Sequence, residues 1–286
     1  AKWRAQNFRS IRSPVYRIFK KAMRYLNPRH WFIAWLERRQ YTDPSVLRYI
    51  AISDMLARDI REAYAVDEGK LRVVFNGVDV ERFHPRNREA HRDGVRRELR
   101  TPADAPVLLH VTNNFRLKGL ATLLEALAAL RGTGAGKGAE LWVLGRGRVR
   151  AYARDVARLG LSDAVRFLGW RPQAERFYAS ADVYAHPTFY DACSLSILEA
   201  MASGVPVVTT ATNGASAYVD EGVNGFVIPD AADAKALADR LERALDPAFR
   251  QRAPKAARKK AEQFPLSRNT EEVLAVYREV AALSKA

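Results

Sequence analysis

Residues 186–210, HPTFYDACSLSILEAMASGVPVVTT, are the stretch from which the fold of this 286-residue chain can be read. Ser194 and Ser196 are good N-cap residues, and the apolar side chains that follow them recur at helical spacing. The Gly-Val-Pro sequence at 204–206 supplies a stop. The stretch therefore predicts a helix over about 194–203 between two buried strands.

Two carboxylates, Asp191 and Glu199, flank the start of this helix. The backbone of Ser194, Leu195 and Ser196 presents N–H groups without helical partners, together with the positive end of the helix dipole, which suits a phosphate or diphosphate. Because carboxylates repel a diphosphate, we expect the two acids to bind neutral hydroxyl groups of a ribose and a sugar ring. The pattern predicts a nucleotide-sugar site. The alternative is an ordinary βα unit in which Asp191 caps the helix and Glu199 is solvated.

The same stretch resembles the E-x7-E signature of family 4 glycosyltransferases, retaining enzymes with the GT-B fold. Asp191 stands where the first Glu of the signature usually is, and Glu199 matches the second. The flanking sequence most resembles the branch of lipopolysaccharide core glucosyltransferases, and the likeness covers most of residues 45–230. The resemblance implies that Asp191 contacts the donor sugar and Glu199 the ribose hydroxyls. It also implies transfer of a hexose, with UDP-glucose as the favoured donor, to a lipid-linked saccharide such as lipopolysaccharide core.

The loop TNNFRLKG, residues 112–119, adds cationic side chains near the same predicted sheet edge. Arg116 and Lys118 precede a helix that opens near Gly119, and both suit a diphosphate that gains charge as the glycosidic bond breaks. In the family this loop carries the donor-diphosphate Arg and Lys. The resemblance therefore implies catalytic contacts for Arg116 and Lys118 and donor contacts for Asn114 and Gly119.

Two further loops, LGRGRVR and LGWRP, place Gly145 and Gly169 at strand ends, where glycine permits a close backbone approach. The family likeness implies that the second loop borders the base. Gly169, Trp170 and Arg171 are therefore candidates for contacts to a uracil edge. The chain has no Asp-x-Asp motif in a fitting loop, and its histidines lack metal-ligand spacing, so we expect no metal and no other cofactor.

The first 50 residues hold twelve Lys or Arg and two acids, a net charge of +10 out of the formal +15. Aromatic and aliphatic residues alternate with this charge at helical steps, as is typical of a helix on an anionic membrane surface. We therefore expect residues 1–40 to contact an anionic membrane, and a cytoplasmic protein held peripherally at the inner face of the cell membrane. A groove for substrate phosphates, a solvated helix face and nucleic-acid binding are the alternatives, and no nucleic-acid motif accompanies the charge.

Predicted strands and helices alternate along the rest of the chain, which indicates a parallel α/β sheet with ligands at the carboxyl ends of its strands. The expected strands are 49–53, 72–75, 107–111, 140–144, 165–167, 183–185, 207–210 and 225–227. The expected organisation is a GT-B type in three parts: a partial acceptor-side Rossmann-like domain (1–85), a complete nucleotide-sugar donor domain (86–264) and a C-terminal helix that crosses back (265–286).

The partial first domain bears on function. It supplies two strands where a complete Rossmann-like domain has about six. By analogy with the family, we expect roughly 80 to 100 preceding residues to be missing, acceptor-side groups among them. The chain is therefore expected to bind donor and to transfer little. The alternative functions are a non-catalytic nucleotide-sugar or membrane-surface binding module and an epimerase on the same fold.

Overall fold

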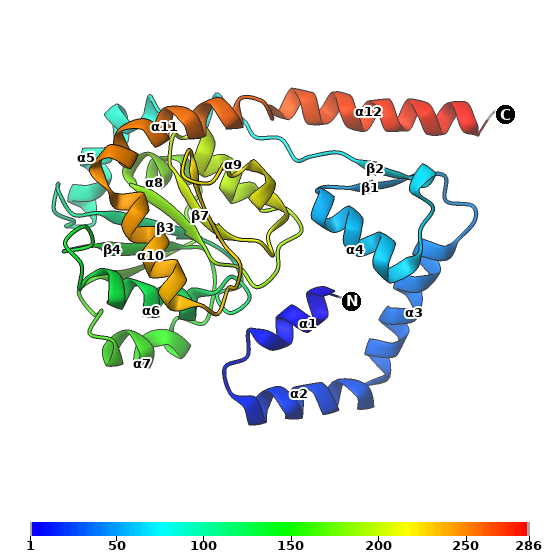
Figure 1. Ribbon diagram of the computed structural model, residues 1–286, viewed down its shortest axis with the longest axis horizontal. Helices are drawn as coiled ribbons and strands as arrows, with labels where there is room; N and C mark the ends of the chain where they lie inside the picture. Colours follow the sequence, from blue (N-terminus) through cyan, green and yellow to red (C-terminus); the bar gives the residue numbers. More distant parts are fainter. Residues whose placement is uncertain (1, 285–286) are drawn as a thin grey trace.

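The computed structural model describes the backbone of residues 2–284 and the side chains of residues 6–23 and 26–284. The larger part of the molecule is built on one six-stranded sheet (Figure 1). Its strands are β3 (Val107–Val111), β4 (Glu140–Leu144), β5 (Val165–Gly169), β6 (Val183–His186), β7 (Val207–Thr210) and β8 (Gly225–Ile228). All neighbouring strands run parallel, which confirms the predicted α/β sheet.

The strand order, β5-β4-β3-β6-β7-β8, reverses direction between β3 and β6. The chain adds β4 and β5 on one side of β3 and the remaining strands on the other side. The loops that follow β3 and β6 therefore leave in opposite directions and open a crevice at the carboxyl ends of these strands. β6 is buried throughout and β3 over its first four residues, as expected for central parallel strands covered on both faces.

Two layers of helices cover the sheet, one on each face. One layer consists of α6 (Leu120–Leu130), α7 (Arg150–Arg158) and α10 (Ala234–Leu245). The other consists of α5 (Asn87–Glu98), α8 (Ala174–Ser180) and α9 (Leu195–Ala202). Helix α11 (Pro247–Ala261) contributes side chains to both clusters, and the short 3₁₀ helix η2 (Gly214–Tyr218) packs near α9.

A smaller part of the chain precedes this sheet. Strand β1 (Tyr49–Ala51) pairs in parallel with β2 (Leu71–Val73), and α4 (Asp54–Tyr64) with the 3₁₀ turn η1 (Glu68–Lys70) connects them. Helix α4 begins at Ser53, whose hydroxyl accepts a hydrogen bond from the backbone N–H of Leu56 at 3.1 Å. These two strands lie where the sequence predicts them.

Helix α12 (Leu266–Leu283) runs from the larger part of the molecule across to the smaller part (Figure 1). Near its end the Glu279 carboxylate accepts hydrogen bonds from Arg48 at 2.7 Å and from Arg72 at 2.6 Å. Because both arginines belong to the smaller part, α12 ties the two parts together.

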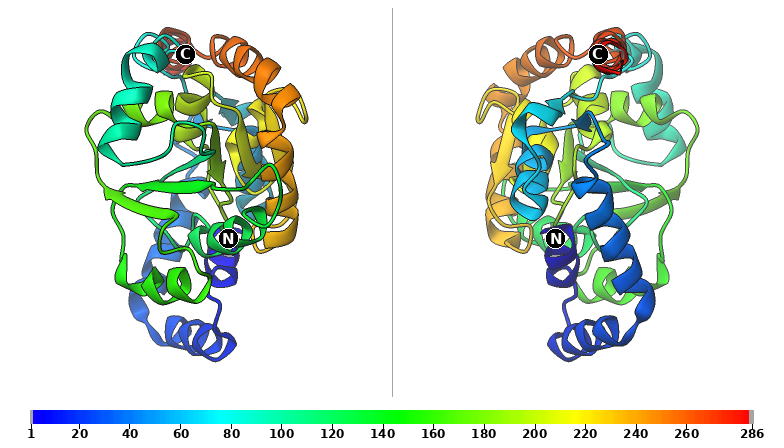
Figure 2. Two further views of the ribbon diagram at one scale, coloured as in Figure 1. Left: turned by 90° about the vertical axis from the view of Figure 1, so that its left-hand side faces the viewer. Right: turned by 90° about the vertical axis from the view of Figure 1, so that its right-hand side faces the viewer.

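The basic amphipathic segment forms three helices, α1 (Lys2–Arg9), α2 (Pro14–Leu26) and α3 (Pro28–Thr42). The end of α1 and the residues that follow it contact the larger part, where Arg9 pairs with Asp230 at 2.7 Å and Arg12 with Glu125 at 2.8 Å. Helix α2 lies at one end of the molecule, away from both sheets (Figure 2). Within the described residues, no helix combines the length and the apolar composition needed to cross a bilayer.

Candidate functional site

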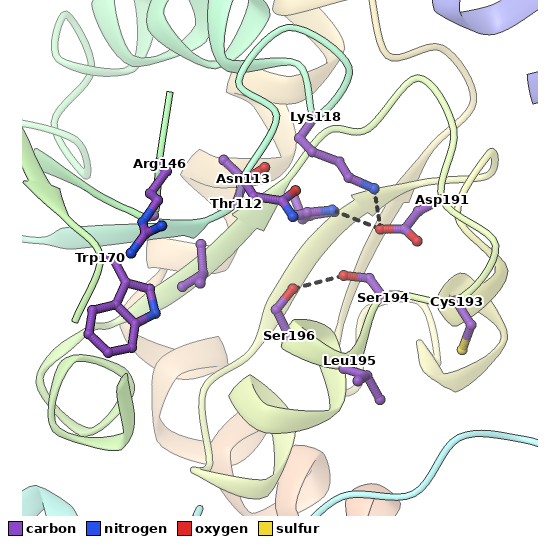
Figure 3. Close-up of a pocket in the computed structure, with 13 residues that line it drawn as sticks. Thr112, Asn113, Lys118, Arg146, Trp170, Asp191, Cys193, Ser194, Leu195 and Ser196 are labelled. Atoms are coloured by element: carbon purple, nitrogen blue, oxygen red, sulfur yellow. Dashed lines mark hydrogen bonds and ion pairs between the residues drawn. The ribbon is translucent and has the colours of Figure 1, made fainter. Parts of the chain in front are cut away.

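A pocket of about 720 Å³ opens at the carboxyl ends of β3 and β6, where the strand order reverses. Figure 3 shows Lys118 and Asp191 on one side of it and Arg146 with Trp170 on the other. The loops after four parallel strands supply most of its wall. It is lined by Val111, Thr112, Asn113, Lys118, Gly145, Arg146, Trp170, His186, Asp191, Cys193, Ser194, Leu195 and Ser196.

Lys118 and Asp191 form an ion pair in the pocket wall. The Lys118 Nζ atom lies 2.5 Å from Asp191 Oδ2, and the Nε2 atom of buried His186 lies 3.5 Å from the same oxygen. Burial raises the pKa of Asp191, but the hydrogen bond with His186 and the charge of Lys118 outweigh it and bring the pKa to about 2. Asp191 is therefore a carboxylate at neutral pH, an acceptor for sugar hydroxyl groups.

The start of helix α9 leaves its first amides open to the pocket. Ser194 occupies the N-cap position, but its hydroxyl makes no capping hydrogen bond and lies 2.8 Å from the Ser196 hydroxyl (Figure 3). Tyr184 donates to the same Ser196 oxygen at 2.6 Å, so the two serine hydroxyls bond each other and Tyr184 and do not cap the helix. The N–H groups of Leu195 and Ser196, in the first turn, have no intrahelical acceptor. This is an anion-binding arrangement.

Glu199 lies one turn further along α9, on the same helix face as Ser196. It does not line the pocket. Its Oε2 atom accepts a hydrogen bond from the hydroxyl of buried Tyr178 at 2.8 Å. Burial raises the pKa of Glu199, partly offset by this hydrogen bond and by the charge of Arg82. The ribose contact inferred from the family stays a prediction.

Arg116 does not face the pocket, which corrects the expectation that it joins Lys118 there. Its guanidinium donates to the backbone carbonyl of Asn7 at 2.8 Å and to the Ser10 hydroxyl at 2.6 Å. Arg116 and Lys118 are two residues apart in a tight turn, so their side chains leave it in different directions. The acceptors at Asn7 and Ser10 hold Arg116 on the outer side.

Arg146, which no sequence motif indicated as a site residue, is the second cation of the pocket. Its guanidinium lies 5.8 Å from the ring centroid of Trp170, a cation–π distance. Trp170 is 62% exposed and stands at the pocket mouth. The position of Arg146 in the Gly-Arg-Gly sequence directly after strand β4 could have indicated it, because a residue there lies at the carboxyl edge of the sheet.

Four other predicted residues lie beside the pocket without lining it. Asn114 turns back into its own loop, where its side-chain oxygen accepts from the Leu117 N–H at 3.2 Å, and Asn113 lines the pocket instead. Arg171 lies 6.0 Å from the Phe177 ring, and Gly169 forms the end of β5. Gly119 precedes α6. The donor contacts expected of these four residues stay predictions, because they lie beside the pocket and not in its wall.

Gly119 and Gly145 are required by the packing of these loops. Gly119 has φ +74°, and a Cβ atom there would lie 1.9 Å from the Pro187 carbonyl oxygen. Gly145, which lines the pocket, has φ +113°, and a Cβ atom would lie 1.8 Å from the Thr112 carbonyl oxygen. The backbones of the neighbouring loops approach so closely that only glycine fits.

Two buried histidines lie side by side at the pocket, where His186 belongs to the wall and His110 packs behind it. The rings of His110 and His186 are 5.6 Å apart, and His110 Nδ1 lies 2.8 Å from the Ala185 carbonyl oxygen. Burial lowers the pKa of His110 to about 3, and burial also lowers the pKa of His186. Both rings are therefore neutral in the folded protein at pH 7. Within the described residues no three His, Cys, Asp or Glu side chains gather as metal ligands would.

This burial predicts a loss of stability in mild acid. The folded-state pKa of His110, about 3, lies below the ordinary 6.5, so the unfolded chain takes up the proton first and stability falls as pH drops below 6.5. Between pH 6 and 4, the free energy of unfolding should fall with each pH unit by about 1.4 kcal/mol less in a His110→Gln variant than in the wild type. Urea unfolding at each pH measures it, with the exposed His30→Gln as control. Equal slopes in wild type and His110→Gln would contradict the assignment.

Comparison with known proteins gives two family matches. The family described as "Glycosyl transferases group 1" matches residues 105–247, half of the chain. The family described as "Glycosyltransferase Family 4" matches residues 13–82.

Individual proteins resemble the chain over most of its length. The D-inositol 3-phosphate glycosyltransferase of Saccharomonospora viridis is 35% identical over 248 residues, which cover 82% of this chain and 56% of that protein. The lipopolysaccharide glucosyltransferase WaaG of Escherichia coli K12 is 26% identical over 226 residues, covering 77% and 59%. A crystal structure of WaaG, a glycosyltransferase involved in lipopolysaccharide biosynthesis, matches with a TM-score of 0.78 at 25% identity, covering 88% of this chain and 68% of that one. The chain spans a little over half the length of these two curated relatives.

Proposed function

This chain belongs to the group 1 glycosyltransferase family, and from that premise we propose that it transfers a hexose from a nucleotide sugar bound at the carboxyl ends of β3 and β6. Its α/β architecture with parallel sheets is that of GT-B glycosyltransferases such as WaaG. The six-stranded sheet carries the donor pocket in this proposal, and the smaller part of the chain belongs to the acceptor side.

The observation that carries the proposal is the convergence of Lys118, Asp191 and the open start of α9 on one pocket. A nucleotide sugar has an anionic diphosphate between two groups rich in hydroxyls. The ammonium of Lys118 and the first-turn amides suit the diphosphate, since both carry positive charge or dipole. The ionised Asp191 suits the hydroxyls of the sugar, because a carboxylate accepts hydrogen bonds and donates none.

The same groups account for the chemistry. As the glycosidic bond breaks, negative charge grows on the departing diphosphate, and Lys118 with the α9 amides stabilises that charge more than the ground state. Arg146, at the opposite wall, adds a further cation. The protein needs no strong nucleophile if the acceptor attacks from the face that the diphosphate leaves, which retains the anomeric configuration. Neutralisation by these groups, with no metal or other cofactor, is part of the proposal.

UDP-glucose is the favoured donor, and a lipid-linked saccharide such as lipopolysaccharide core is the favoured acceptor. The name of the E. coli relative, lipopolysaccharide glucosyltransferase, supports glucose as the sugar and lipopolysaccharide as the acceptor. The exposed ring of Trp170 at the pocket mouth is suited to a flat base such as uracil. The S. viridis relative acts on D-inositol 3-phosphate, so a polyol phosphate belongs in any acceptor panel.

An anionic membrane surface is the proposed partner of helices α2 and α3. Side chains that a soluble helix would bury stand exposed there, among them Val15, Ile18 and Trp31 at 76%, 68% and 61%. Lys20 and Lys21 lie on the same helix α2. Apolar insertion together with lysine charge suits a cytoplasmic protein held at the inner face of the membrane, near a lipid-linked acceptor.

Vesicle sedimentation tests the membrane proposal. The protein should partition onto vesicles containing phosphatidylglycerol and much less onto pure phosphatidylcholine. Removing Lys20 and Lys21 by substitution with glutamine should weaken partitioning about tenfold or more, since each charge contributes roughly 1 kcal/mol. Replacing the exposed Lys255 and Lys259 of α11 serves as the control. Equal binding to both vesicle types would refute the proposal.

Calorimetric titration with UDP-glucose, UDP and GDP tests the donor proposal, followed by assays of donor hydrolysis and transfer. We expect UDP-glucose and UDP to bind and GDP to bind more weakly. Transfer with retention supports the enzyme. Donor binding without turnover supports a nucleotide-sugar binding module, and the absence of any nucleotide binding contradicts both readings.

Replacing Glu199 with alanine should weaken nucleotide affinity severalfold if its carboxylate holds the ribose. Its carboxylate accepts a hydrogen bond from Tyr178 at 2.8 Å and lies on α9 one turn after Ser196. Calorimetry with UDP measures the loss. Glu271→Ala, which removes an exposed acid from α12, is the matched control. Unchanged UDP affinity in Glu199→Ala would contradict the ribose contact.

A further inference from the structure

A second concentration of charge lies at the opposite edge of the main sheet. Helix α5 directs Arg88, Arg92 and Arg96, four residues apart and so on one helix face, at a single carboxylate. Their terminal nitrogens lie 3.3, 3.0 and 2.8 Å from oxygens of Asp182. Arg250 of α11 reaches the same carboxylate at 2.9 Å. Within residues 6–23 and 26–284, Asp182 is the one carboxylate paired with any of the four, which leaves an excess of three positive charges.

The inner two arginines have a structural role. Arg96, with 3% of its side chain exposed, also donates to the carbonyl oxygens of Pro102 and Ala105 at 3.0 and 2.9 Å. Arg92 donates to the carbonyl oxygen of Ser180 at 3.1 Å. These bonds fasten α5 to the segments that precede β3 and β6, and they satisfy the buried guanidinium of Arg96.

The outer two arginines have N–H groups without an acceptor among the described residues. Arg88 is 44% exposed and bonds only Asp182 and the Ala181 carbonyl oxygen among the described residues. Arg250 is 36% exposed, and within the same residues its one acceptor is Asp182. A guanidinium has five N–H donors, so most of those on Arg250 are available.

Both outer arginines line a pocket of about 530 Å³. Its wall also includes Ser203, which is 5% exposed and whose hydroxyl has no hydrogen-bond partner among the described residues. A buried hydroxyl without a partner is uncommon in folded proteins and calls for an explanation. The pocket therefore combines uncompensated positive charge with an unused hydroxyl donor.

We propose that this pocket binds a phosphate group, either inorganic phosphate or the phosphate of a phosphomonoester, between Arg88 and Arg250, with the Ser203 hydroxyl as a third donor. The planar fork of arginine matches the oxygens of a phosphate in two-point contact. A phosphate dianion would neutralise two of the three excess positive charges that remain after Asp182 is counted. The Ser203 hydroxyl and the free N–H groups of Arg88 and Arg250 have no role in the pocket proposed for the nucleotide sugar.

The two pockets lie at opposite ends of the strands of the main sheet. Asp182 immediately precedes β6 and Pro206 precedes β7, so the arginine pocket lies at the amino edge of the strands. The donor pocket lies at their carboxyl edge. Helix α9 spans the distance, because its first turn faces the donor pocket and Ser203 follows its last turn. A ligand in one pocket cannot contact the other.

Calorimetric titration with inorganic phosphate at constant ionic strength tests the site. The double variant Arg88→Gln/Arg250→Gln should bind phosphate at least tenfold more weakly than the wild type. The double variant Lys255→Gln/Lys259→Gln, which removes the same charge from exposed positions of α11, should bind as the wild type does. Lys118→Ala should also retain phosphate binding, since it alters only the donor pocket.

A second measurement uses the wild-type protein and does not depend on how the variants fold. Phenylglyoxal modifies accessible arginines, and peptide mass spectrometry locates the sites. Phosphate should protect Arg88 and Arg250 at least fivefold and leave the exposed Arg252 unprotected. Equal affinity in Arg88→Gln/Arg250→Gln and the wild type overturns the proposal, as does the absence of protection. Loss of all phosphate binding in Lys118→Ala overturns it too, because it assigns the ion to the donor pocket.

Discussion

Replacing Lys118 with alanine should lower the rate of hexose transfer about 100-fold while weakening donor binding only severalfold, because the loss of one preorganised donor to a developing oxyanion costs roughly that much. The Lys118 ammonium sits between Asp191 Oδ2, at 2.5 Å, and the Tyr190 carbonyl oxygen, at 3.4 Å. It is therefore held in place before the diphosphate gains its charge, which is the condition for stabilising the transition state more than the ground state.

The comparison of kcat with the donor Kd decides the role of Lys118. Where no acceptor has been identified, the rate of single-turnover UDP-glucose hydrolysis is measured in place of the rate of hexose transfer. Lys137→Ala, in an exposed loop far from the pocket, controls for loss of a lysine as such. Equal losses in kcat and in binding would show that Lys118 only anchors the ground state. A second readout is the pKa of Asp191, which should rise in Lys118→Ala because the lysine charge helps to hold it near 2.

Gly145→Ala should destabilise the fold by about 3 kcal/mol or more, since it combines a positive φ with an atomic overlap. The added Cβ atom would lie 1.8 Å from the Thr112 carbonyl oxygen, at a φ of +113°. That oxygen belongs to backbone at the end of β3, where Thr112 also donates its N–H to the Leu144 carbonyl oxygen at 2.9 Å. The overlap can be relieved only by moving the β3 and β4 ends apart, which also widens the donor pocket.

Urea unfolding measures this loss against a control position where an added Cβ atom has room. Gly160→Ala also places a side chain at a positive φ, +67°, which lies in the left-handed α region, and its Cβ atom would meet no heavy atom within 4 Å. It should therefore cost only about 1 kcal/mol, the penalty for a side chain in the left-handed region. A similar free energy of unfolding for both variants would mean that the ends of β3 and β4 separate easily.

Local patterns predicted the elements of the main sheet closely. The helix expected over 194–203 is α9, Leu195–Ala202, and the strand expected over 207–210 is β7, Val207–Thr210. Buried parallel strands are nearly continuous apolar runs, and helices begin at Ser or Asp and end at Gly, so the signals lie in neighbouring residues. The direction of the sheet followed from the alternation of strands and helices.

The sites depended on contacts between distant residues. Lys118 and Asp191 were both expected in the pocket and lie there, whereas Arg116 is held outside it by Asn7, 109 residues earlier in the chain. No pattern around Arg116 reports that contact. Arg250 likewise meets Asp182 across 68 residues, and only the packing of α11 against the sheet shows it.

The family, the succession of strands and helices along the chain, and the edge of the sheet where the pocket lies could all be inferred from the amino-acid sequence, because each depends on residues close together in the chain or on the parallel topology that they impose. The three-dimensional fold was needed to show which side chains of those loops line the pocket, that Arg146 and not Arg116 is among them, and that four arginines share one carboxylate. A loop side chain takes its direction from whichever acceptor the rest of the fold brings within about 3 Å, and that acceptor can come from any part of the chain.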